Sequence, residues 1–396
     1  MANVSSSNGL EKRPKLRFPG FGEPWKVFKA EELFQNVTDK NHSDETVLTI
    51  IQGKGTLPRE QAGRNIHYDD ASLSNYKKVE QGDFIIHLRS FEGGLEMANE
   101  AGIVSPAYTI LRCKRPHSSL FYDAYFHTGE FINHNLSKSV EGIRDGRQIS
   151  YEAFKWLGIP YCEPTEQEKI SSLFSVLNER IAKQRDLVES LKKYKRGASD
   201  YLFLQNSKMP IHCKWKQLLF GDVVEINPKT PPLPEQFIYI DLECVESGEL
   251  KSLNYIDKNH APSRAQRVLC RNDVLFQMVR PYQKNNYLFR DIFDVPVVAS
   301  TGYAQIRCSD CNPIFVYEQI SSEQFSREAM MRSIGTGYPA INADGLAQIP
   351  FYVPTPEEQE EIGVFLSALG TKIAKESEIL AALDIIKKAL MQQLFI

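Results

Sequence analysis

Long apolar runs are missing from this chain of 396 residues. No stretch approaches the roughly 20 consecutive apolar residues that a membrane-spanning helix needs. The opening letters, MANVSSSNGLEKRPK, lack the apolar centre of a secretory signal, and their polarity predicts a disordered arm over residues 1–15. These absences predict a cytoplasmic protein that makes no contact with a membrane.

Cysteines are few and scattered. The chain has seven, an odd number without regular spacing, so a disulfide framework is not expected. Cys308 and Cys311 form a single C-x-x-C pair, but a zinc site needs two further ligands at similar spacing and none follows. The sequence therefore predicts reduced thiols and no metal site.

An excess of charge of either sign is also lacking. The chain has 47 Lys and Arg residues against 50 Asp and Glu, a formal net charge of −3. Nucleic-acid-binding chains are often basic, so the overall charge does not indicate that role, although a local basic cleft on a neutral body remains compatible with it. Apolar residues at 42% and charged residues at 24% are ordinary for a soluble protein, and the length predicts two or three domains.

What the sequence does contain is a repeat. Counting from Ile170, apolar residues fall at offsets +3, +4, +7, +11, +18, +21 and +24, and the same offsets from Ile362 are also apolar. This spacing predicts a long amphipathic helix, written twice 192 residues apart. The two stretches close on similar letters, YLF at 201–203 and QLF at 393–395. Two such stripes would bury each other in an antiparallel pair.

Both helices are expected to begin at a capping box. Thr165 is followed three residues later by Glu168, and Thr355 by Glu358, so each threonine and glutamate would bond free amides of the first turn. Pro356 fits the first helical position, where a missing amide costs nothing.

The repeat extends upstream of the helices. GDFIIHLR at 82–89 parallels NDVLFQMVR at 272–280, each a polar turn entering a β-rich segment. IVSPAYTILRC at 103–113 parallels VASTGYAQIRC at 298–308, with matching serine, tyrosine and arginine positions. The sequence therefore predicts two duplicated mixed α/β (α+β) domains, each followed by a long helix and related by a pseudo-two-fold axis.

The globular parts have diverged more than the helices. This difference predicts that the helices share one task while the domains carry out two different ones. The expected boundaries are an arm over 1–15, a first domain over 16–163, a central helix over 164–206, a second domain over 207–353 and a C-terminal helix over 354–396.

Four segments carry a resemblance to a known family. They are KLRFPGFGEPWK at 15–26, GDFIIHLRSFEGGLEMANEAGIVSPAYTIL at 82–111, PTEQEKI at 164–170 and PTPEEQEEI at 354–362. In these segments and in its order of domain, helix, domain and helix, the chain resembles the specificity subunit of type I restriction-modification systems over residues 16–396.

The resemblance implies a non-catalytic subunit with two target-recognition domains, each reading one half of a split sequence in double-stranded DNA. It implies that the helices separate these domains and hold two methyltransferase subunits, and that a restriction and translocase subunit joins the complex. No cofactor is expected in this chain, because the partner methyltransferase would use S-adenosylmethionine.

Arginine, glutamine and asparagine can each read a base edge with two hydrogen bonds. Such residues gather in loops between expected strands, where phosphate and base contacts are both accessible. In the first domain the expected DNA contacts are Arg59, Gln61, Arg64, Asn65, Arg89, Ser90, Phe91, Arg144 and Arg147. In the second domain they are Arg264, Arg267, Arg280, Tyr282, Gln283, Lys284 and Asn285.

The helices supply the expected partner-binding residues. These are Glu166, Gln167, Ile170 and Leu177 in the first helix and Glu358, Gln359, Ile362 and Leu369 in the second. A second interpretation of the acidic and amide residues is that they only cap the helices.

Enzyme-like motifs offer a competing hypothesis. NPIF at 312–315 resembles the N-P-P-F/Y of amino-methyltransferases, but the second proline and a Gly-rich loop for the methyl donor are missing. Asp241 with Glu249 and Lys251 imitates a metal-dependent nuclease site, yet the segment fits two strands joined by a glycine turn.

The third possibility is a scaffold whose two domains bind proteins and not DNA, which the near-neutral charge favours slightly.

Overall fold

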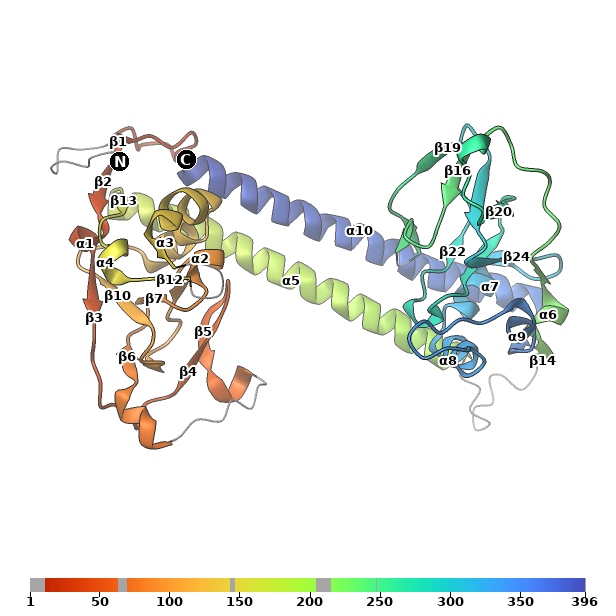
Figure 1. Ribbon diagram of the computed structural model, residues 1–396, viewed down its shortest axis with the longest axis horizontal. Coiled ribbons are helices and arrows are strands. Elements are labelled where there is room, and N and C mark those ends of the chain that lie inside the picture. The colour runs from red at the N-terminus through yellow and green to blue at the C-terminus, as the bar shows by residue number, and fades with distance from the viewer. Residues whose placement is uncertain (1–10, 63–69, 143–146, 204–214, 247, 396) are drawn as a thin grey trace. The chain divides into compact units, whose positions relative to one another are not determined.

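Two units make up the chain in the computed structural model, which describes residues 11–62, 70–142, 147–203, 215–246 and 248–395. The first unit comprises Met1–Gln184 with Ile379–Ile396, and the second comprises Arg185–Glu378. Both draw on the two long helices, α5 (Pro164–Phe203) and α10 (Pro356–Phe395), of 40 residues each (Figure 1).

The first unit alternates short strands with short helices. Its strands are β1 (Glu11–Lys12), β2 (Trp25–Lys29), β3 (Phe34–Val37), β4 (Leu48–Ile51), β5 (Gly55–Pro58), β6 (Lys77–Val79), β7 (Phe84–Ile86), β8 (Glu96–Met97), β9 (Gly102–Val104), β10 (Thr109–Cys113), β11 (Val140–Glu141), β12 (Gln148–Ile149) and β13 (Gly158–Tyr161). Its short helices are α1 (Ala30–Leu33), η1 (Arg59–Ala62), η2 (Asp70–Asn75), α2 (Ser90–Gly93), α3 (Ser119–Phe126), η3 (Glu130–Asn135), η4 (Leu136–Ser139) and α4 (Tyr151–Phe154). The largest sheet has the antiparallel order β3-β10-β7-β8.

The second unit has the same alternation. Its strands are β14 (Lys216–Leu219), β15 (Glu225–Ile226), β16 (Gln236–Ile240), β17 (Val245–Glu246), β18 (Glu249–Leu250), β19 (Asn254–Asp257), β20 (Ala265–Val268), β21 (Val274–Gln277), β22 (Tyr287–Leu288), β23 (Val297–Ser300), β24 (Tyr303–Arg307) and β25 (Pro350–Val353). Its short helices are α6 (Phe220–Val223), η7 (Lys258–His260), η8 (Pro281–Gln283), α7 (Pro313–Ile320), α8 (Glu323–Met331) and α9 (Ala343–Ala347). Two sheets have the orders β15-β24-β21-β22 and β19-β16-β23-β20.

The predicted duplication of a mixed α/β unit is confirmed by strand order. The sheet β3-β10-β7-β8 of the first unit matches β15-β24-β21-β22 of the second. The strand before each long helix pairs with a strand near the start of its unit, β13 with β2 and β25 with β14. The second unit also has the sheet β19-β16-β23-β20, in which β16 and β23 are parallel. In the first unit the pairs β4-β5 and β6-β9 are linked by an isolated parallel bridge between Val47 and Ile103.

Strand β1 corrects the expectation of a disordered arm. Glu11 and Lys12 pair antiparallel with β2, and the Leu16 amide donates to the carbonyl of Gln393 at 3.0 Å. Polar composition did not reveal this strand because backbone hydrogen bonds need no apolar side chain. Residues 1–10 lie outside the described part of the chain.

Helix α5 begins earlier than its predicted capping box. Its first residue is Pro164, so Thr165 lies inside the first turn and is not the cap. The amides of Glu166 and Gln167 donate to the carbonyl of Glu163 at 2.9 and 3.0 Å. Proline needs no amide partner at the first helical position, which places the helix start at Pro164.

Helix α10 begins as predicted. Pro356 is its first residue, the Glu358 amide donates to Thr355 Oγ1 at 3.3 Å, and the Thr355 amide donates to the Glu358 carboxylate at 3.2 Å. Pro164 and Pro356 are 192 residues apart, the same offset as the apolar stripe. The prolines, and not the threonines, therefore mark the equivalent starts of the two helices.

The core of the first unit is completed by the end of α10. Phe395 is fully buried, and its ring centre lies 6.1 Å from that of Trp25, 5.2 Å from that of Phe121 on α3 and 6.0 Å from that of Phe174 on α5. The end of α10 thus packs beside the beginning of α5.

The core of the second unit is completed by the end of α5. Phe203 is buried, and its ring centre lies 6.5 Å from that of Trp215 and 5.9 Å from that of Phe315 on α7. Leu366, near the beginning of α10, belongs to the same buried cluster. The helices therefore run antiparallel where they meet in each unit, as their shared stripe predicts.

We expect Phe395→Ala to lower the free energy of unfolding by about 3–5 kcal/mol, because it leaves a cavity among aromatic rings. The control is Ile385→Ala on the same helix, whose side chain is 67% exposed and whose loss should change stability by less than about 0.5 kcal/mol. Urea unfolding followed by circular dichroism measures both. Equal, small effects would show that the end of α10 does not hold the first core.

Candidate nucleic-acid interface

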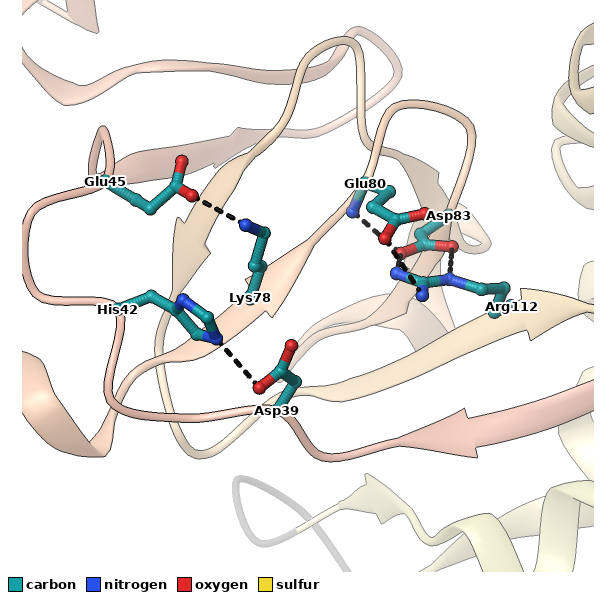
Figure 2. A network of polar contacts seen from close by, with 7 residues as sticks. All are labelled: Asp39, His42, Glu45, Lys78, Glu80, Asp83 and Arg112. Atoms are coloured by element: carbon teal, nitrogen blue, oxygen red, sulfur yellow. Dashed lines mark hydrogen bonds and ion pairs between the residues drawn. The ribbon is translucent and has the colours of Figure 1, made fainter.

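Two arginines at matching positions of the repeat form ion pairs that stabilise the fold. Arg112 on β10 donates from Nε and Nη2 to the Asp83 carboxylate at 2.9 and 2.7 Å and pairs with Glu80 at 3.2 Å (Figure 2). Arg307 on β24 makes the same two bonds to Asp273 at 2.9 and 2.8 Å. Both aspartates are buried, and their hydrogen bonds raise the pKa of each arginine. These pairs tie β10 and β24 to the turns before β7 and β21.

Other charges near this network are also paired. Figure 2 shows Lys78 on β6 beside Glu45, with Nζ 2.6 Å from the carboxylate, and His42 beside Asp39, with Nε2 2.8 Å from the carboxylate. The hydrogen bond to Glu45 raises the pKa of Lys78. The basic side chains in this part of the first unit are therefore bonded to carboxylates and do not form a basic surface.

The residues of the first unit that the sequence predicts to contact DNA lie on separate segments. Arg59 and Gln61 belong to η1, where Arg59 is half-buried with its guanidinium carbon 6.0 Å from the Tyr76 ring centre and Gln61 is exposed. Arg89 is exposed directly before α2. Three further candidates lie outside the described residues: Arg64, Asn65 and Arg144.

Two adjacent candidates on α2 have different surroundings. Ser90 is fully buried and its Oγ accepts the His87 amide at 2.8 Å, so this hydroxyl holds the turn and is not exposed to a ligand. Phe91 is half-buried, and the exposed Arg147 stacks on it with the guanidinium carbon 4.4 Å from the ring centre. The structure thus joins two candidates from loops far apart in the sequence.

A buried glutamine organises the loop that follows β21. Gln277 donates from Nε2 to Gln283 Oε1 at 2.8 Å and accepts the Asn285 amide at 3.1 Å. Lys284 pairs with Glu323 on α8, with Nζ 2.6 Å from the carboxylate. The sequence reasoning missed Gln277, because an inward-pointing amide in a strand is visible only once its neighbours are known.

The other second-unit candidates divide between two places. Tyr282, in η8, is 51% exposed and lies in the loop shaped by Gln277. Arg264 is exposed just before β20, and Arg267 is half-buried within β20, where burial lowers the pKa of its guanidinium. Strand β20 belongs to one sheet of the unit and β21 to the other, so these candidates come from two sheets.

Arg280 occupies a distinctive position at the start of η8. It adopts left-handed backbone angles (φ 55°, ψ 57°), rare for a residue with a side chain, and its amide donates to the carbonyl of Pro339 at 2.7 Å. Its guanidinium carbon lies 4.2 Å from the ring centre of Tyr338, which is 70% exposed. The sequence reasoning did not select Tyr338, whose signal in the sequence is an aromatic residue between Gly337 and Pro339.

The acidic and amide residues that start α5 bind their own unit, which corrects their assignment to a partner surface. Glu166 is 1% exposed and accepts from Arg17 Nε and Nη2 at 2.9 and 2.7 Å and from Trp25 Nε1 at 3.0 Å. Gln167 is fully buried and accepts the Ser118 amide, before α3, at 3.0 Å. Burial leaves neither side chain exposed to a partner.

On α10 the buried glutamine does the same, whereas the glutamate only caps the helix. Gln359 is buried, accepts the Asn312 amide before α7 at 2.9 Å and donates to the Pro354 carbonyl at 3.2 Å. Glu358 is engaged in the capping box with Thr355. The two glutamines thus attach the start of each long helix to the start of α3 or α7.

Of the four apolar helix candidates, Ile170 is buried in the first core. Leu177 is half-buried, and Ile362 and Leu369 pack partly buried against the second core. More exposed apolar side chains lie beside them in the second unit, where Tyr194, Tyr201 and Phe365 line an open cavity of about 830 Å³.

Comparison with known proteins shows what this chain is similar to. The family described as type I restriction modification DNA specificity domain matches residues 284–384. The type I restriction enzyme MjaVIII specificity subunit of Methanocaldococcus jannaschii is 20% identical over 408 residues, covering 96% of this chain and 93% of its own. The chain is similar to type I restriction-modification specificity subunits over nearly its whole length. The resemblance expected from the sequence is confirmed.

Solved structures of such subunits share the fold. The type I restriction-modification S subunit of M. genitalium has a TM-score of 0.60 at 14% identity, covering 97% of this chain and 99% of that chain. A chain from a study of assembly and conformational transition in the type I R-M system has a TM-score of 0.55 at 16% identity, covering 96% and 99%.

Specificity subunits supply DNA specificity within the restriction-modification complex and are non-catalytic, as the sequence predicts for this chain. Within the described residues no group of three or more His, Cys, Asp or Glu side chains is placed to hold a metal ion. No helix in the described parts of the chain is long and apolar enough to cross a membrane.

The buried glutamine of α10 gives a test of the corrected assignment. We expect Gln359→Ala to lower the free energy of unfolding by about 1–3 kcal/mol, because the Asn312 amide loses its acceptor. The matched control, Glu357→Ala, removes an exposed neighbour and should have little effect. If Gln359→Ala left stability unchanged but weakened binding of a methyltransferase subunit, the side chain would belong to the partner surface after all.

Proposed function

We propose that each unit of this specificity subunit binds one half of a bipartite sequence in double-stranded DNA, with the first half read by the first unit and the second half by the second. The observation that carries the proposal is the duplication itself. The two units share strand order and the Asp–Arg pair, yet their loops after β7 and β21 have different residues. Equal scaffolds with unlike loops suit two different half-sites.

We assign the spacing of the half-sites, and the recruitment of two methyltransferase subunits, to α5 and α10. Both helices contribute to both units. The cavity lined by Tyr194, Tyr201 and Phe365 offers apolar surface for a partner. A restriction and translocase subunit would complete the assembly, and S-adenosylmethionine would bind the methyltransferase and not this chain.

The salt dependence of binding distinguishes the DNA-binding hypothesis from the hypothesis of a protein scaffold. The formal net charge of −3 slightly favours the scaffold. We expect the assembled complex to bind duplex DNA with an affinity that falls steeply between about 50 and 200 mM salt, because bound phosphates release counterions. Fluorescence anisotropy on a labelled duplex measures this slope. A protein scaffold predicts no appreciable binding at any salt concentration.

The division of labour predicts half-site effects. Arg280→Ala should weaken recognition of one half-site and Arg89→Ala that of the other, each by about 1–3 kcal/mol. Competition between duplexes mutated in one half at a time measures the effect. The control is Arg180→Ala, which removes the same charge from an exposed position on α5. Equal loss at both halves from either substitution would refute the assignment of one half to each unit.

A further inference from the structure

An arginine rests on an aromatic ring in both units, but the loops that supply the two residues are exchanged. In the first unit the loop after β7 supplies the ring, Phe91, and the loop before β12 supplies Arg147, at 4.4 Å. In the second unit the loop after β21 supplies Arg280 and the loop before α9 supplies the ring, Tyr338, at 4.2 Å.

The loops are equivalent by their place in the fold. Strands β7 and β21 are each third in the shared sheet. The other two loops start at glycines with positive φ, Gly142 at 84° and Gly335 at 102°, a conformation that favours glycine. They lead to the caps of α4 and α9, the first by way of β12, and at these caps Ser150 and Asn342 accept an amide three residues on, at 3.2 and 2.7 Å. The same stacked pair therefore spans the same two loops in both units.

Arg280 is held differently from the arginines that serve the fold. Arg307 is fixed by two bonds to Asp273, whereas Arg280 has no ion pair among the described residues and its Nε has no hydrogen-bond partner there. Its support is the face of Tyr338 and a left-handed backbone. Stacking orients the plane of a guanidinium and leaves its terminal N–H groups available to a ligand.

The surroundings of Arg280 favour a base edge over a phosphate. Arg280 and Tyr338 line an open cavity of about 630 Å³, and its other charged lining residues are Glu243 and the ion pair of Glu246 with Lys251 at 3.6 Å. Carboxylates repel phosphate but accept from the amino group of a base such as cytosine. Arginine binds guanine through O6 and N7 with two hydrogen bonds, the commonest specific contact in the major groove.

We propose that each stacked arginine reads one guanine, Arg147 in one half-site and Arg280 in the other, and that Phe91 and Tyr338 are positioning residues that aim them. The proposal rests on the function proposed above and adds a base identity and a role for each ring. It predicts a G·C pair in both halves of the target.

The test is selection of a randomised duplex pool by the complete complex, followed by sequencing. Wild type should enrich a G·C pair in each half. Tyr338→Ala should reduce the preference for that pair in one half by about tenfold or more, the range expected when a two-bond contact is lost. Tyr338→Phe, which keeps the ring, should select as wild type does. Phe91→Ala and Phe91→Tyr form the matched set for the other half.

Three outcomes would overturn the inference: Tyr338→Ala selecting as wild type does, Tyr338→Ala weakening all sequences equally, or Tyr338→Phe behaving as the alanine variant. In each of these the wild type still selects a split sequence, so the proposed function stands. Selection of no sequence by the wild type would instead remove the proposed function. Thermal unfolding of each variant confirms that the fold is retained.

Discussion

The burial of one phenylalanine at the end of each long helix is the contact on which both units depend. Phe395 closes the core of the first unit and Phe203 that of the second, while Gln167 and Gln359 attach the helix starts. Each helix is therefore fixed at its start in one unit and at its end in the other. Such double attachment explains why the helices have kept one pattern while the loops have diverged, since a change in a helix disturbs two cores.

Most of the fold follows from the sequence, because each segment of one repeat can be compared with the equivalent segment of the other. The apolar stripe at a constant offset predicts both helices and their antiparallel packing, and the matched segments predict the shared sheet. The comparison failed where two residues are of the same type but are not at equivalent positions of the repeat. Thr165 looks like Thr355, yet the stripe aligns Pro164 with Pro356 and leaves Thr165 inside the first turn. Strand β1 was not predicted because backbone hydrogen bonds hold it, and side-chain composition does not reveal these.

The candidate site was less predictable, because a residue's type does not reveal which neighbours have already engaged it. Glu166 has the appearance of an exposed helix residue, but Arg17 and Trp25 bury it. Ser90 sits in a loop that suits DNA binding, but a turn occupies its hydroxyl. Tyr338 carries no charge and no repeated pattern, and only its stacking on Arg280 reveals it. Chain positions alone do not show that the loops after β21 and before α9 meet.

Methylome sequencing of a host that carries the complete system tests the central claim most directly, that one chain holds two independent readers. The account predicts methylation at a split sequence, with two specified halves separated by unspecified bases of constant number. A chimaera that exchanges only the second unit should change one half and leave the other intact. A single continuous recognition sequence, or a chimaera that alters both halves, would contradict the account.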